Sequence, residues 1–95
     1  MKNSSNHLNE LYELFVKINN VEDCKAFLED LCTYKEVEQM AQRAYAAKLL
    51  LSGETYSEII AKTDISSATL SRVSRALSHG SGGYGKIISG DQNES

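Results

Sequence analysis

The chain is 95 residues long, carries a formal net charge of −3 at pH 7 and contains no proline. A chain of this length can bury only a modest core, and pairing two copies would bury more apolar surface. The sequence has no run of about 18 apolar residues that could span a membrane and no secretory signal at its start, so we expect a cytoplasmic protein that does not associate with membranes.

Two amphipathic helices are expected in the first third of the chain. The first has apolar side chains at three- and four-residue spacing, at Leu8, Leu11, Phe15 and Ile18, with Tyr12 and Leu14 beside them. Asn19 and Asn20 interrupt this pattern. A second helix follows through Leu31, and Asn20 is suited to cap its N-terminus.

The longest helix is expected between Thr33 and Gly53. Thr33 and Glu36 have the spacing of a capping box, in which the hydroxyl accepts from the backbone of the glutamate and the carboxylate reaches back. One side of this helix is expected to carry Val37, Met40, Ala41, Ala44, Ala47, Lys48 and Leu51. Gly53 is suited to the left-handed conformation that ends many helices.

A short helix and a tight turn are expected next. Thr55 and Glu58 form a second capping box, which opens the short helix. The helix is expected to end near Thr63, with Asp64 in the turn, because aspartate can satisfy nearby backbone groups with its own side chain.

A further helix is expected from Ser67 to about Ser78, with Ser66 as its cap. Its inward-facing side chains are expected to be Leu70, Val73 and Leu77. A short helix, a turn and a second helix over residues 55–78 form the plan of a helix-turn-helix.

The exposed face of this second helix has an unusual composition. It is expected to carry Ser67, Thr69, Ser71, Arg72, Ser74 and Arg75, and no carboxylate occurs between Ser66 and Gly90. Hydroxyl groups and the free N–H groups of a first helical turn donate to phosphates, and an arginine can donate two hydrogen bonds to guanine. The alternative is a helical hairpin with a serine-rich solvent face, but serine is a mediocre helix former, which favours a binding role.

The distribution of charge agrees with this role, although a net negative charge argues against a general nucleic-acid binder. Residues 1–33 contain six acidic and three basic side chains, whereas residues 66–88 contain Arg72, Arg75 and Lys86 and no acidic residue. The basic part of the chain therefore lies toward its C-terminus.

We therefore predict a sequence-specific transcriptional regulator that binds double-stranded DNA. The residues expected at base edges are Ser67, Thr69 and Arg72. Those expected at phosphates or base edges are Tyr56, Lys62, Ser71 and Arg75, and Ser66 belongs to the same surface. The alternative function is a protein-interaction module that docks a partner regulator or polymerase subunit, because three local basic charges are few for a DNA-binding surface.

The segment after this helix is rich in glycine between Gly80 and Gly85 and is expected to be a linker. Residues 84–88 are expected to dock on the body, and residues 89–95 are expected to form a disordered tail. The sequence thus predicts a single all-α domain over residues 1–88, with five or six short helices.

No catalytic or metal-binding arrangement is expected. Cys24 and Cys32 lie in apolar stretches and are expected to be small core side chains in a reducing compartment. His7 and His79 lie at opposite ends of the chain, which makes a zinc site improbable. No nucleophile with a neighbouring base is visible, so we expect neither enzymatic activity nor a cofactor.

Several separated motifs carry a resemblance to a known family. In chain order they are Asp30-Leu31-Cys32-Thr33, Glu36, Ala41-Gln42-Arg43, Thr55-Tyr56, Glu58-Ile59 and the stretch from Ser67 to Val73. From about Leu8 to Tyr84 the chain resembles the YerC/YecD type of Trp-repressor-like proteins. The resemblance implies an intertwined, all-helical homodimer whose two helix-turn-helix units face DNA. An ordinary monomer core is the alternative explanation of the broad apolar face of the first helix.

The resemblance also implies the remnant of an effector pocket. Thr33, Arg43 and Arg72 match residues near the ligand of the Trp repressor, but Val73 stands where the repressor has glycine. Because three extra carbons would overfill that space, we predict that tryptophan does not bind, and no small-molecule effector is expected. The two arginines leave room for another small anion, although an ion pair of Arg43 within the dimer and a phosphate contact of Arg72 are favoured.

Overall fold

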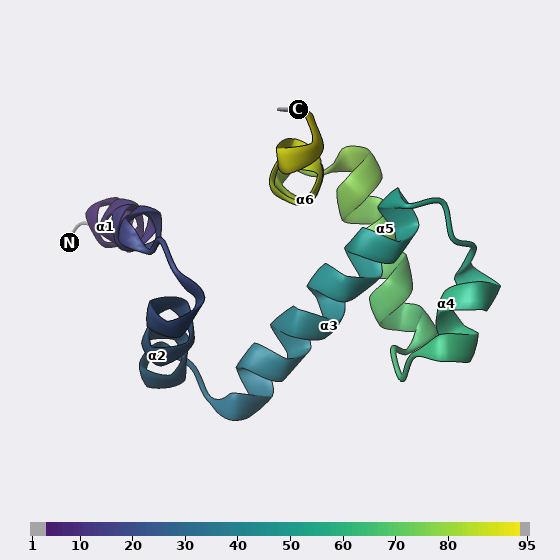
Figure 1. Cartoon of the computed structure of the whole chain (residues 1–95), viewed down its shortest axis with the longest axis horizontal. Coiled ribbons are helices and arrows are strands. Elements are labelled where there is room, and N and C mark those ends of the chain that lie inside the picture. The colour runs from purple at the N-terminus through teal and green to yellow at the C-terminus, as the bar shows by residue number, and fades with distance from the viewer. Residues whose placement is uncertain (1–3, 94–95) are drawn as a thin grey trace. The chain divides into compact units, whose positions relative to one another are not determined.

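The computed structural model describes residues 4–93 and contains six helices and no strand in this part of the chain (Figure 1). The helices are α1 (Ser4–Lys17), α2 (Val21–Leu31), α3 (Tyr34–Leu51), α4 (Tyr56–Lys62), α5 (Ser67–His79) and α6 (Gly83–Asn93). The predicted all-α fold is confirmed. The chain divides into two compact units, residues 1–37 and 38–95, so the single domain over residues 1–88 stays a prediction.

Local side-chain hydrogen bonds start the helices of the first unit. Asn20 Oδ1 accepts from the Asp23 backbone N–H at 2.8 Å, which caps α2. Ahead of α3, the Thr33 N–H donates to Glu36 Oε1 at 2.8 Å, and the Glu36 N–H donates to Thr33 Oγ1 at 3.1 Å. Both caps were predicted, because each depends only on residues three positions apart.

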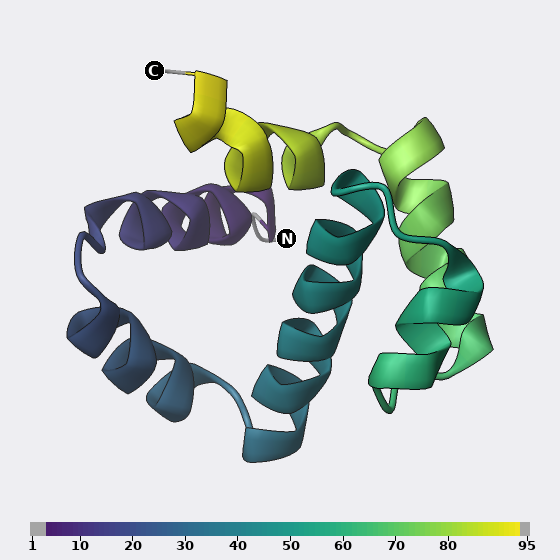
Figure 2. The same ribbon diagram turned by 45° about the vertical axis from the view of Figure 1, so that its right-hand side comes forward.

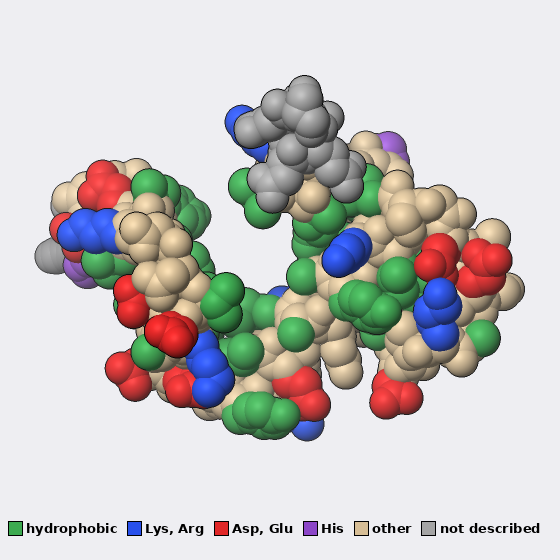
Figure 3. All heavy atoms as spheres, viewed as in Figure 1, with side chains coloured by type: hydrophobic (Ala, Val, Ile, Leu, Met, Phe, Trp, Pro, Cys, Tyr) green, Lys and Arg blue, Asp and Glu red, His purple; other side chains and the backbone are tan. Residues whose placement is uncertain are grey.

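The first unit contains no fully buried side chain among residues 6–37. It contains an edge-to-face pair of Phe15 and Phe27, whose ring centroids lie 5.6 Å apart. Large apolar side chains remain open to solvent, including Tyr12 (58% exposed) and Val16 (82% exposed). Figure 3 shows apolar side chains on the surface of this unit.

An apolar groove of about 570 Å³ runs along α2 and the start of α3. Its lining residues are Val21, Cys24, Lys25, Leu28, Glu29, Cys32, Tyr34 and Val37. Cys24 and Cys32 are half-buried and unpaired here, so they line an open groove and do not lie in a closed core within this unit.

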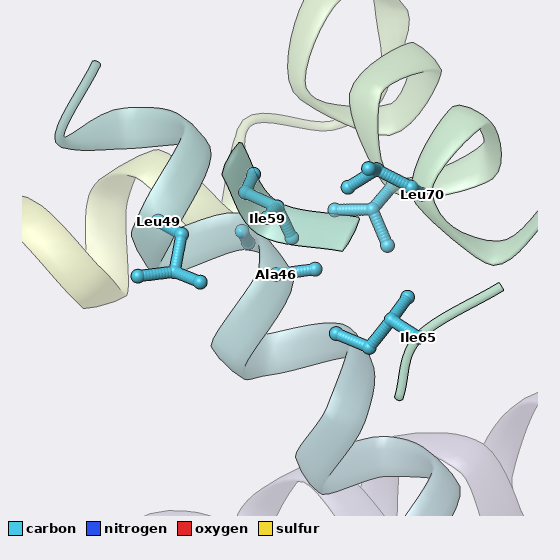
Figure 4. Close-up of a cluster of buried hydrophobic side chains, with 7 residues drawn as sticks. Ala46, Leu49, Ile59, Ile65 and Leu70 are labelled. Carbon is cyan, nitrogen blue, oxygen red and sulfur yellow. The ribbon is translucent and has the colours of Figure 1, made fainter. Parts of the chain in front are cut away.

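The core of the second unit joins α3, α4 and α5. It contains Ala46, Ala47, Leu49, Ile59, Ile65, Leu70 and Val73. Figure 4 shows part of this cluster, with side chains from α3, α4, α5 and the turn before α5. Helices α4 and α5 pack against each other, as do α5 and α6 (Figure 2). Leu70 and Val73 are buried as predicted, and Leu77 is half-buried against the same cluster.

The buried side of α3 differs from the predicted one. Ala47 is buried as expected, but Ala41, Ala44 and Leu51 are exposed, and Leu49 is buried instead. The sequence pattern assumed one stripe along the whole helix, whereas the core of this unit uses only the residues near its C-terminal end. Small side chains at that end allow close approach of the neighbouring helices.

Helix α6 corrects two expectations about the C-terminal segment. Gly83 and Gly85 lie inside a helix that continues to Asn93, so residues 83–85 are not a linker and residues 89–93 are not a disordered tail. Residues 94–95 lie outside the described part of the chain. Tyr84 and Ile88 are one helical turn apart and pack against the core, which explains why a glycine-rich start still forms a helix.

Candidate nucleic-acid interface

The helix-turn-helix begins where α3 ends at a left-handed glycine. Gly53 has φ +97°, a conformation that costs glycine little, and so reverses the chain after Leu51. The Thr55 N–H then donates to Glu58 Oε1 at 2.8 Å, and the Glu58 N–H donates to Thr55 Oγ1 at 3.2 Å. The predicted capping box therefore starts α4.

The turn between α4 and α5 is closed by Thr63. Its hydroxyl donates to the Ile59 carbonyl at 2.8 Å and accepts from the Ile65 N–H at 3.2 Å. Ile65 is buried and anchors the turn in the core. Asp64 is exposed and has an ordinary negative φ, so these turn contacts come from its neighbour.

Helix α5 starts at a pair of hydroxyl groups. The Thr69 N–H donates to Ser66 Oγ at 3.1 Å, and Ser66 Oγ donates to Thr69 Oγ1 at 3.0 Å. The Ser66 hydroxyl is thus engaged by the helix start, whereas the Thr69 hydroxyl proton remains available to a partner. The predicted cap is confirmed.

The outer face of α5 is exposed while its inner face is fixed in the core. Ser67, Ser71, Arg72 and Arg75 are exposed, and Leu70 on the opposite side is fully buried. Within residues 4–93, the structure contains no ion pair or side-chain hydrogen bond of either arginine. Two guanidinium groups are therefore available to an external acceptor on a rigidly supported helix.

The two candidates on α4 differ in their surroundings. Tyr56 is exposed at the first position of the helix. Lys62 Nζ lies 3.1 Å from Glu54 Oε1, and its hydrogen bond to this carboxylate raises the pKa of Lys62. Lys62 is therefore already partnered, unlike the two arginines of α5.

Arg43 and Arg72 line one polar pocket of about 190 Å³ between α3 and α5, together with Gln39, Gln42 and Thr69. The two glutamines were not among the predicted site residues, although Gln39 lies one helical turn before Arg43 and so shares its face. Val73 does not line this pocket, because its side chain is buried in the core. Thr33 belongs to the other unit, where it caps α3.

The described residues offer neither a metal-binding cluster nor a helix suited to crossing a membrane. Among them, no three His, Cys, Asp or Glu side chains gather in a way that could hold a metal ion. Over the same residues, no helix has both the length and the apolar character needed to cross a bilayer.

Comparison with known proteins places this architecture in a family. The family model of the Trp repressor protein matches residues 6–92. The uncharacterised protein YerC of Bacillus subtilis strain 168 is 39% identical over 77 residues, which make up 81% of this chain and 74% of YerC.

Two solved structures share the fold. A Trp-repressor-type protein from Staphylococcus aureus has a TM-score of 0.83 and 37% identity, over 92% of this chain and 86% of the other. A TrpR-like protein from Eubacterium eligens has a TM-score of 0.83 and 33% identity, over 90% and 88%. This chain therefore belongs to the Trp repressor family.

Proposed function

We propose that the protein is a cytoplasmic transcriptional regulator without enzymatic activity. It binds a specific site on double-stranded DNA as a homodimer, and α5 is its recognition helix. The observation that carries this proposal is the unpartnered polar face of α5, which presents Arg72 and Arg75 on a helix whose other side is buried in the core. A rigidly held helix with donors along its outer face suits entry into the major groove.

The other candidate residues extend this surface along the helix-turn-helix. Ser67, Thr69 and Arg72 serve as base contacts near the N-terminal part of α5. Tyr56, Ser71 and Arg75 serve as phosphate or base-edge contacts, and Lys62 joins them to the extent that it leaves its ion pair with Glu54. Ser66 contributes by fixing the start of the helix.

The homodimer is supported by the composition of the first unit. None of its side chains from residue 6 to residue 37 is fully buried, although Leu8 and Tyr12 of α1 are large and apolar. Leaving this much apolar surface in water forfeits the main driving force of folding. A second copy that packs on α1 and α2 would cover it and would place two copies of α5 on one DNA site.

Selection from random DNA tests the DNA-binding part of the proposal. The purified protein is retained on a pool of random duplexes at about 0.15 M salt, where screening weakens non-specific contacts. We expect enrichment of a two-fold symmetric sequence, its loss in Arg72→Ala, and its retention in the charge-matched control Lys17→Ala. No enrichment, with a protein partner recovered instead after nuclease treatment, would favour the protein-docking alternative.

Sedimentation tests the homodimer independently of DNA. We expect a particle of twice the 10.5 kDa chain mass. Leu8→Glu should shift it toward the monomer, because Leu8 is apolar and 52% exposed on α1. Asn6→Glu introduces the same charge at an exposed polar position of the same helix and should leave the dimer intact. A wild-type monomer at every accessible concentration would contradict the proposal.

A further inference from the structure

The side chains of α5 limit which base it can identify. The helix Ser67–His79 contains no Asn, Gln, Asp or Glu. In the major groove, Asn and Gln make two hydrogen bonds to adenine, acidic residues accept from cytosine, and arginine donates two to O6 and N7 of guanine. The arginines are therefore the only side chains of α5 that can bind one base edge through two hydrogen bonds.

The position of Arg72 favours a base contact over a phosphate contact. It lies in the N-terminal half of α5, the part of a recognition helix that meets base edges, whereas Arg75 lies about 4.5 Å further along the axis. The neighbouring Ser67 and Ser71 are small and exposed, which allows the helix backbone to approach the groove closely.

The pocket beside Arg72 also favours an outward orientation. Arg43 lines the same pocket from α3, so two positively charged side chains share it. Like charges repel, and no acidic side chain lines the pocket to compensate. The repulsion between Arg72 and Arg43 is relieved when the Arg72 side chain extends out of the pocket toward acceptor atoms on DNA.

We propose that Arg72 reads a guanine in each half-site of the operator by donating to its O6 and N7 atoms. Arg75 contacts the phosphate backbone and carries no sequence information. This inference rests on the proposed DNA-binding function and specifies the base that the recognition helix selects.

Replacing single atoms of the DNA tests the contact directly. Each guanine of the selected operator is exchanged in turn for 7-deazaguanine, which keeps Watson–Crick pairing and lacks the N7 acceptor. We expect one position per half-site at which wild-type affinity falls about tenfold, because one of the two hydrogen bonds of the bidentate contact is lost. Arg72→Ala should bind the exchanged and the unmodified duplex equally.

Two further variants separate the roles of the arginines. Arg72→Gln should shift the preferred base at that position from guanine toward adenine, because an amide pairs with adenine N6 and N7. Arg75→Ala should weaken all sequences alike and keep the guanine preference. Circular dichroism melting should show that these exposed substitutions leave the fold intact.

The possible failures are distinguishable. Two outcomes would overturn the guanine contact and leave DNA binding standing. In the first, no guanine of the operator depends on Arg72. In the second, 7-deazaguanine lowers the affinity of the wild type and of Arg72→Ala equally. Retention of no duplex at all would overturn the proposed function and this inference with it.

Discussion

Lys62 Nζ lies 3.1 Å from Glu54 Oε1 and 3.2 Å from Glu54 Oε2, so the last turn of α4 is joined to the residue just before its cap. This ion pair links the two ends of α4, which carries the candidate DNA-contacting residues Tyr56 and Lys62. It also neutralises the one lysine that the sequence placed at a phosphate.

Glu54→Gln should lower the pKa of Lys62. The hydrogen bond and charge of Glu54 raise this pKa above its ordinary value of 10.5. Because the folded-state pKa is raised, the pair stabilises the fold fully below the unfolded value and loses this effect as pH rises through the folded pKa. An NMR titration of Lys62 checks the shift, and an unchanged titration in Glu54→Gln would contradict the pairing.

The same substitution should strengthen DNA binding. Releasing Lys62 adds a cation that can approach a phosphate, so affinity should rise and the slope of log affinity against log salt should steepen by about 1. Fluorescence anisotropy at several salt concentrations measures both quantities. The double variant Glu54→Gln/Lys62→Ala should lose the increase in DNA affinity. If it keeps this increase, removal of the Glu54 carboxylate alone explains the stronger binding, and Lys62 makes no phosphate contact.

Thr55→Ala should destabilise the protein by about 1 kcal/mol, the usual loss for an N-cap whose hydroxyl accepts from the helix. The Glu58 N–H, which donates to this hydroxyl at 3.2 Å, would lose its partner. Urea unfolding measures the change. Ser57→Ala, at an exposed position in the same first turn, should alter stability by no more than a few tenths of a kcal/mol.

Gly80, which caps the end of α5, and Gly83, which starts α6, should respond differently to alanine. At Gly80 a Cβ would lie 2.5 Å from the Ala76 carbonyl oxygen, so Gly80→Ala should cost about 1–3 kcal/mol. A Cβ added at Gly83 would meet no atom of another part of the chain within 4 Å. Gly83→Ala should therefore stabilise α6 by about 0.4–1 kcal/mol. Thermal unfolding compares the two, and equal melting temperatures would contradict the close approach at Gly80.

The helix starts could be predicted from the sequence because they depend on neighbours in the chain. Ser66 and Thr69 are three positions apart, so the hydroxyl that caps α5 and the N–H that it accepts from are fixed by one local spacing. The same holds for the caps ahead of α2, α3 and α4.

The buried side of α3 could not be predicted in this way. Ala41 belongs to the predicted apolar stripe and Leu49 does not, yet the packing of α4 and α5 leaves the first exposed and the second buried. Likewise, the glycines near Gly83 favour a loop locally, but the packing of Tyr84 and Ile88 on the core outweighs this preference. Both results depend on residues distant in the chain.

Tryptophan should not bind, even though Arg43 and Arg72 share a pocket. The pocket has a volume of about 190 Å³ and is lined by glutamine, arginine and threonine, with no apolar side chain for an indole ring. Val73, which we expected to obstruct the ligand, is buried in the core and does not line the pocket, so the polar lining replaces it as the reason for this prediction. Calorimetry should detect no binding at about 1 mM tryptophan, which corresponds to less than about 4 kcal/mol of affinity. A tighter dissociation constant that is lost in Arg43→Ala would show that the pocket keeps the ligand of the repressor.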